Sequence, residues 1–201
     1  TYLHDFYNYG GLARSVWIYS VPAVNVTDVT VKTDFAGTTG KVAYQVETSA
    51  TADVRVALFD EAGKEVATAT SANGQLEIAN VKLWQPGNAY LYKLKVEALV
   101  DGAVADEYHL NVGVRTVKVD GNKFLVNNEP FYFTGFGMHE DHVVKGKGHD
   151  NSFMVNDFEL LKWVGANSFR TSHYPYAEEV MDYADRHGIL IIDETAAVGF
   201  N

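Results

Sequence analysis

The last third of the chain constrains the fold most, because strand-like and helix-like segments alternate there. Three short segments have the length of strands, two of them apolar and one ending in polar residues, and two longer segments repeat apolar residues at the spacing of a helix. The strands are predicted at residues 131–137, 166–172 and 189–192, and the helices at residues 152–164 and 176–187. Repeated strand–helix units of this size predict a parallel sheet, either the start of a barrel or a doubly wound sheet.

The predicted helices also carry start and stop residues. Pro175 stands where a missing N–H is harmless at a helix start, and Gly165 and Gly188 stand where helices commonly end. Apolar residues recur along one face of each helix, namely Met154, Phe158 and Leu161 in the first and Ala177, Val180, Met181 and Ala184 in the second. The run of residues 189–192 (ILII) is then predicted as a strand buried on both faces.

Charged and polar residues follow the predicted parallel strands, at the edge where α/β sheets bind ligands. Arg170 and His173 end one strand, and Asp193 and Glu194 end the next. The two carboxylates have two interpretations: partners that neutralise Arg170, or the acid and base of a glycosidase. Adjacent strand residues point to opposite faces, so Asp193 and Glu194 make a poor catalytic pair. We favour an ion pair with Arg170 for at least one of them.

Two histidine-containing segments are candidate ligand contacts. His173 precedes a rigid Tyr-Pro bend at a strand end, which favours contact with a ligand over the alternative of a satisfied core histidine. His139 and His142 stand in a polar loop (MHEDH) that could hold a metal or a polar ligand. Their spacing indicates no third ligand, so we predict neither a metal site nor a cofactor.

The middle of the chain changes to a period of two. Apolar residues alternate with polar ones in several short segments with turns between them, as in Val42, Tyr44 and Val46. This pattern predicts an antiparallel sandwich of immunoglobulin type, which we interpret as a structural module.

Two further segments flank the sandwich. Residues 14–19 are predicted as a strand that ends a preceding β domain. Residues 117–126 are predicted as a hairpin with a two-residue turn at Asp120-Gly121.

Composition narrows the range of partners. The 201 residues have a net charge of -10 without a basic run, which disfavours nucleic acids and anionic membranes. The absence of cysteine excludes disulfides and thiolate zinc sites, and no apolar stretch has the length of a membrane span.

The start of the chain carries no pattern of a signal peptide and no initiator methionine, so these ends need not be the natural ones. Cytoplasmic and secreted locations both stay open.

The chain resembles the family 2 glycoside hydrolases. Residues 167–175 (NSFRTSHYP) and 188–192 (GILII) carry the family resemblance. The chain also resembles, along its whole length, a subgroup of this family that acts on β-D-glucuronides. The segments that carry this resemblance are residues 5–9, 83–87, 131–141, 145–148 and 196–201. The resemblance implies three domains: the end of a jelly-roll sugar-binding domain (1–22), an immunoglobulin-like β-sandwich (23–115) and the first three βα units of a TIM (β/α)8 barrel (116–201).

The resemblance also implies an activity and a set of site residues. The family hydrolyses β-linked glycosides with retention, using two glutamates from later barrel strands, so we expect no catalytic residue in this chain and no turnover by it alone. By resemblance Asp5 and His173 hold sugar hydroxyls, His139 lies beside them, and Arg170 orients the active-site carboxylates. The expected partners are a glucuronide substrate and, for the parent protein, further copies of itself in a dimer or tetramer.

Two alternatives stay open. A β-galactosidase or β-mannosidase of the same family would share these motifs, because the groups that grip a glucuronic acid carboxylate are expected downstream. The chain could also be a non-catalytic carbohydrate-binding or structural module.

Overall fold

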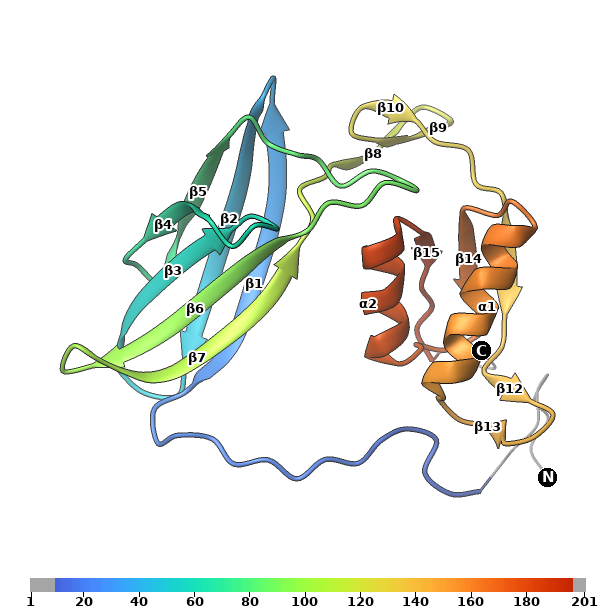
Figure 1. The fold of residues 1–201 in the computed structure, drawn as a ribbon, viewed down its shortest axis with the longest axis horizontal. Helices are drawn as coiled ribbons and strands as arrows, with labels where there is room; N and C mark the ends of the chain where they lie inside the picture. The colour runs from blue at the N-terminus through green and yellow to red at the C-terminus, as the bar shows by residue number, and fades with distance from the viewer. Residues whose placement is uncertain (1–9, 197–201) are drawn as a thin grey trace. The chain divides into compact units, whose positions relative to one another are not determined.

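The computed structural model describes residues 10–196, which form two compact units (Figure 1). One unit is continuous and comprises Tyr19–Phe131. The other combines residues 10–18 with residues from Tyr132 onward, so a segment from the start of the chain joins the α/β part.

The continuous unit contains a sandwich of two antiparallel sheets. One sheet has the order β1-β2-β5, and the other has the order β4-β3-β6-β7. In the first sheet the strands are β1 (Val26–Ala36), β2 (Thr39–Thr48) and β5 (Asn73–Ala79). In the second they are β3 (Asp53–Phe59), β4 (Glu65–Ala69), β6 (Tyr92–Val100) and β7 (Ala103–Val112).

The alternating residues of the sequence form the core between these sheets. Val42, Tyr44 and Val46 of β2 are at most 5% exposed and pack with residues of β3 and β6. Because side chains alternate across a strand, the polar residues between them face outward. The predicted alternation is confirmed for these strands. Without disulfides, packing of these apolar side chains must hold the two sheets together.

A small three-stranded sheet follows the sandwich in the same unit, with β8 (Val117–Asp120), β9 (Lys123–Val126) and β10 (Glu129–Pro130). The predicted hairpin is confirmed, but its turn lies one residue later than expected. Asp120 pairs with Lys123, so the two-residue turn is Gly121-Asn122, with Gly121 at φ 58°. A left-handed backbone there suits glycine, which has no Cβ to clash.

The α/β unit contains three parallel strands in the order β11-β14-β15. The strands are β11 (Gly135–Met138), β14 (Ser168–Thr171) and β15 (Leu190–Ile192), and a short hairpin of β12 (Asp141–His142) and β13 (Gly146–Lys147) follows β11. The connecting helices are α1 (Asn151–Trp163) and α2 (Glu178–His187) (Figure 1). The predicted strand–helix alternation is confirmed. Within residues 10–196, neither helix has the length and apolarity of a membrane span.

Both helices cover one face of this sheet. Phe158 and Leu161 of α1, Val180 and Ala184 of α2, and Phe169 of β14 belong to one buried cluster. Phe158 and Phe169 meet edge to face, with ring centroids 5.6 Å apart. The four helical residues of this cluster are among those that the helical spacing predicted for the core. Arg170 follows Phe169 in β14, and Ile192 follows Ile191 in β15. Because side chains alternate along a strand, Arg170 and Ile192 point away from the face that the helices cover.

Three predicted details of this unit were wrong. β11 starts at Gly135 rather than residue 131, so its glycines lie inside the strand instead of ending it. α2 begins at Glu178, three residues after Pro175, while Gly188 does end it with a left-handed backbone at φ 68°. Ile192 is 49% exposed, so β15 is not buried on both faces. The helices cover only the face that carries Ile191.

The predicted strand at residues 14–19 was also wrong. This segment has no regular secondary structure, and Val16, Trp17, Ile18 and Tyr19 are all more than two-thirds exposed. An apolar run becomes a strand only where a neighbouring edge accepts its backbone hydrogen bonds. Among the described residues, no strand pairs with this segment.

Gly135 is required by the close approach of β11 to β14. A Cβ at this position would lie 2.0 Å from the carbonyl oxygen of Ser168, a backbone atom that cannot move aside. We expect Gly135→Ala to lower the free energy of unfolding by about 1–3 kcal/mol, as overpacking does. Urea denaturation measures the change. Gly10→Ala is the control, because its Cβ would meet nothing within 4 Å, and an equal loss in both variants would contradict the account.

Candidate functional site

The carboxyl ends of the three parallel strands lie side by side. Met138 of β11 is in register with Thr171 of β14, and Arg170 is in register with Ile192 of β15. The residues that follow these positions therefore meet at one edge of the sheet. They include His139, His173, Asp193 and Glu194, as the topology predicted.

Arg170 and Glu194 form a two-point ion pair at this edge. Arg170 Nη2 donates to Glu194 Oε2 at 3.1 Å, and Arg170 Nε donates to Glu194 Oε1. These hydrogen bonds lower the pKa of Glu194 and raise the pKa of Arg170. The prediction that at least one of the adjacent carboxylates pairs with Arg170 is confirmed. The guanidinium holds this carboxylate in its charged form with a fixed direction.

Asp193 is bound by a different partner. The Thr171 hydroxyl donates to Asp193 Oδ1 at 2.9 Å and accepts from the Glu194 backbone N–H at 2.8 Å. Thr171 is fully buried, whereas its neighbour Arg170 is nearly half exposed. The two carboxylates are thus held by adjacent residues of one strand that point to opposite faces. Asp193 and Glu194 therefore have different partners, and their exclusion as a catalytic pair stays a prediction.

His139 and His173 lie close together above the strand ends. Their ring centroids are 5.7 Å apart at an interplanar angle of 48°. The charge of His173 also contributes to lowering the pKa of Glu194, after the larger effect of Arg170. His139 Nδ1 lies 3.8 Å from Asp141 Oδ2, and the His139 side chain is 42% exposed. Two imidazoles and the Arg170–Glu194 pair therefore provide hydrogen-bond donors and acceptors on neighbouring loops.

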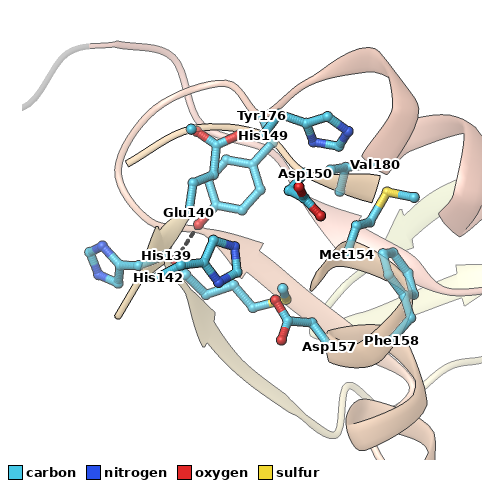
Figure 2. Close-up of a pocket in the computed structure, with 12 residues that line it drawn as sticks. His139, Glu140, His142, His149, Asp150, Met154, Asp157, Phe158, Tyr176 and Val180 are labelled. Atoms are coloured by element: carbon cyan, nitrogen blue, oxygen red, sulfur yellow. Dashed lines mark hydrogen bonds between the residues drawn. The ribbon is translucent and has the colours of Figure 1, made fainter. Parts of the chain in front are cut away.

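A buried carboxylate lies directly after His139 and was not predicted as a site residue. Glu140 is 9% exposed, and burial raises its pKa against the lowering effect of Arg14. It lines a small pocket of about 30 Å³ with His149 and Tyr176 (Figure 2). The Tyr176 hydroxyl donates to the Met138 carbonyl, and the Glu140 backbone N–H donates to the Tyr174 hydroxyl at 3.3 Å. The loop after β11 is thus tied to the loop after β14.

The other histidine of the first loop, His142, lines the same pocket as Glu140. His142 stacks on Phe153 with centroids 4.0 Å apart. Within residues 10–196, no group of three or more His, Asp or Glu residues is arranged to hold a metal ion.

Asp150 lines the same pocket and caps the start of α1, where its side chain accepts hydrogen bonds from the backbone N–H groups of Ser152 and Phe153. A hydrogen bond from Lys145 helps to lower the pKa of Asp150 to about 2.

The structure brings together three of the four residues predicted for the site. His139, His173 and Arg170 lie on adjacent strand ends, whereas Asp5 lies outside the described residues. Arg14 was not singled out in the sequence, and Glu140 was considered only as part of the polar loop MHEDH. The signal for Glu140 was its place between two histidines at a strand end, but nothing in the sequence indicated its burial.

Two models of one family match nearly the whole chain. Residues 24–115 match "Glycosyl hydrolases family 2", and residues 117–201 match "Glycosyl hydrolases family 2, TIM barrel domain". The first match covers the sandwich. The second contains every described residue of the strand-end site.

Relatives and solved structures agree with this assignment. A β-glucuronidase of Paenibacillus borealis is 54% identical over 99% of this chain and 34% of its own length. The human β-glucuronidase is 47% identical over 97% of this chain and 32% of its own length. The structure of a Ruminococcus gnavus β-glucuronidase in complex with D-glucuronic acid is 46% identical, with a TM-score of 0.95, over 98% of this chain and 34% of that one. The chain spans about a third of the length of these relatives, and it belongs to the glycosyl hydrolases of family 2.

Proposed function

We propose that this chain is part of a retaining glycoside hydrolase that cleaves β-D-glucuronides into glucuronic acid and an alcohol. One observation carries the proposal: proteins named β-glucuronidase are 46–54% identical to this chain over 97–99% of it. That span includes the strand ends with His139, Arg170 and His173. A likeness of this extent favours a shared substrate class over a shared fold alone.

The proposed organisation has three parts, with residues 1–22 ending a jelly-roll domain, residues 23–115 forming an immunoglobulin-like module and residues 116–201 starting a (β/α)8 barrel. The two facing sheets support the second part. The parallel order β11-β14-β15 with helices on one face supports the third. Ligands of such barrels bind at the carboxyl ends of the strands.

In the proposed site, His173, His139 and Asp5 hold sugar hydroxyls, and Arg170 fixes the active-site carboxylates. The ring centroids of His139 and His173 are 5.7 Å apart, so side chains from the loops after β11 and β14 are close enough to contact one sugar ring. The bidentate contact of Arg170 with Glu194 supports an orienting role. Hydroxyls held this way contribute to catalysis where the hydrogen bonds strengthen in the transition state.

The acid/base and nucleophilic glutamates are proposed to lie outside this chain. Glu194 is occupied by Arg170, and Glu140 is buried beside Arg14, so neither presents a free carboxylate at the histidines. We expect the 201-residue chain alone to show no turnover of 4-nitrophenyl β-D-glucuronide. Clear turnover by the isolated chain would contradict this placement.

The substrate class is tested by comparing three aryl glycosides on the full-length protein. We expect kcat/KM for the β-glucuronide to exceed the values for the β-galactoside and β-mannoside by about 100-fold or more, because recognition of a carboxylate discriminates strongly against sugars without one. A preference for the galactoside or mannoside would assign the alternative activity within the family. Absence of turnover on all three, with sugar binding in calorimetry, would favour the non-catalytic module instead.

A further inference from the structure

Arg14 contacts two loops that are far from it in the sequence. It belongs to the segment of residues 10–18, which has no regular secondary structure but joins the α/β unit. Arg14 Nη2 donates to the carbonyl oxygen of Pro175 and lies 3.8 Å from Glu140 Oε1. One guanidinium therefore reaches the loop after β11 and the loop after β14.

The main chain beside Arg14 is fixed to the first of these loops. His149 N donates to the carbonyl oxygen of Ala13 at 2.9 Å. A Cβ at Gly148 would lie 3.3 Å from the same oxygen, so glycine permits this approach. The position of Arg14 is therefore set by backbone contacts and does not depend on its own side chain alone.

The carboxylate opposite Arg14 is buried. The Glu140 side chain is 8% exposed, and Arg14 is the largest of the charges that oppose the effect of burial on its pKa. A buried carboxylate that loses its nearby cation is destabilised, because no charge compensates for its loss of hydration. It then takes up a proton or moves toward solvent. Removal of the Arg14 charge should therefore disturb Glu140 and the loop that carries it.

Both contacts of Arg14 are adjacent to a candidate sugar-binding histidine. Glu140 directly follows His139, and Pro175 follows His173 by two residues. The Glu140 N–H also donates to the Tyr174 hydroxyl, between His173 and Pro175. We propose that Arg14 is a positioning residue that holds the His139 and His173 loops at the spacing needed to bind the sugar. This role rests on the proposed function, because it presumes that the two histidines contact the sugar.

The kinetic test uses the full-length protein and 4-nitrophenyl β-D-glucuronide. We expect Arg14→Met to lower kcat/KM about 10- to 100-fold, since small displacements of positioned groups cost this much. Arg14→Lys should recover only part of the loss, because an ammonium cannot reproduce the spread of guanidinium donors. Arg186→Met is the matched control: Arg186 pairs with Asp182 on the exposed side of α2 at 2.9 Å, and its loss should change kcat/KM less than twofold.

A double variant separates positioning from a general loss of stability. If Arg14 acts through His173, Arg14→Met should cost much less in the His173→Ala background than in the wild-type protein, because coupled residues are not additive. The same fold-loss in both backgrounds would overturn the proposal. So would an Arg14→Met variant with wild-type kcat/KM.

A second readout does not depend on activity. Hydrogen exchange should become faster in the Arg14→Met variant at the amides of residues 139–149 and 172–176, and stay unchanged in the sandwich. Unchanged exchange in both loops would overturn the positioning role even in an active enzyme. Faster exchange in a protein that cleaves no aryl glycoside would support the clamp between the loops and refute the proposed function, so the two failures are distinguishable.

Discussion

Replacement of His173 by alanine is expected to lower kcat/KM of the full-length protein toward 4-nitrophenyl β-D-glucuronide by about 100-fold or more. Loss of one positioned hydrogen-bonding group that strengthens its contact in the transition state has an effect of this size. His173 lies beside His139, with ring centroids 5.7 Å apart, and its charge contributes to lowering the pKa of Glu194. Steady-state kinetics of the variant measures the loss.

The control for this prediction is another histidine of the same chain. His109 lies on β7 of the sandwich, is 56% exposed and contacts Glu107. His109→Ala should leave kcat/KM within about twofold of the wild-type value, since surface substitutions away from a site have small effects. A His173→Ala variant as active as His109→Ala would remove His173 from the sugar pocket.

The second large effect is expected for Arg170→Met, which should lower kcat about 100-fold with a smaller change in KM. Arg170 lowers the pKa of Glu194 and fixes its direction. Without the guanidinium, Glu194 loses the two hydrogen bonds and the neighbouring positive charge that lower its pKa and fix its position. An orienting role acts on the chemical step more than on substrate affinity, so kcat should carry most of the loss.

Two further variants identify which carboxylates depend on Arg170. Arg55→Met removes an arginine of the sandwich that also contacts two carboxylates, Glu65 and Glu97, and should leave kcat unchanged. Glu194→Gln removes only the negative charge that Arg170 contacts among residues 10–196. A smaller loss for Glu194→Gln than for Arg170→Met is expected if Arg170 also orients catalytic glutamates from later strands. Equal losses would confine its role to Glu194.

The fold was predictable where the pattern of apolar residues decides it. The alternation of Val42, Tyr44 and Val46 predicted a strand whose apolar face is buried, because one face of each sheet packs on the other sheet. The spacing of Phe158 and Leu161 predicted the buried face of α1 for the same reason. The exposed segment at residues 14–19 has an equally apolar sequence, but a strand also needs a partner, and local sequence does not encode one.

The site was predictable only in part. The placement of Arg170, His173 and Glu194 at one edge followed from the parallel topology, since parallel strands end at the same edge of a sheet. The expected ion pair between Arg170 and one of the two adjacent carboxylates is present, whereas the contact of Asp193 with Thr171 was not predicted. The contact of Arg14 with Glu140 was not predictable, because it joins distant segments through irregular loops whose path depends on the folded structure. The place of Asp5 in the pocket stays a prediction.

The most direct test of the central claim is a crystal structure of the full-length protein with D-glucuronic acid bound. The account predicts the sugar at the carboxyl ends of β11 and β14, with a ring nitrogen of His173 about 2.7–3.2 Å from a sugar hydroxyl. It also predicts that no carboxylate of residues 10–196 contacts the anomeric carbon. A sugar bound away from these strand ends, or one without a polar contact to His173, would contradict the account.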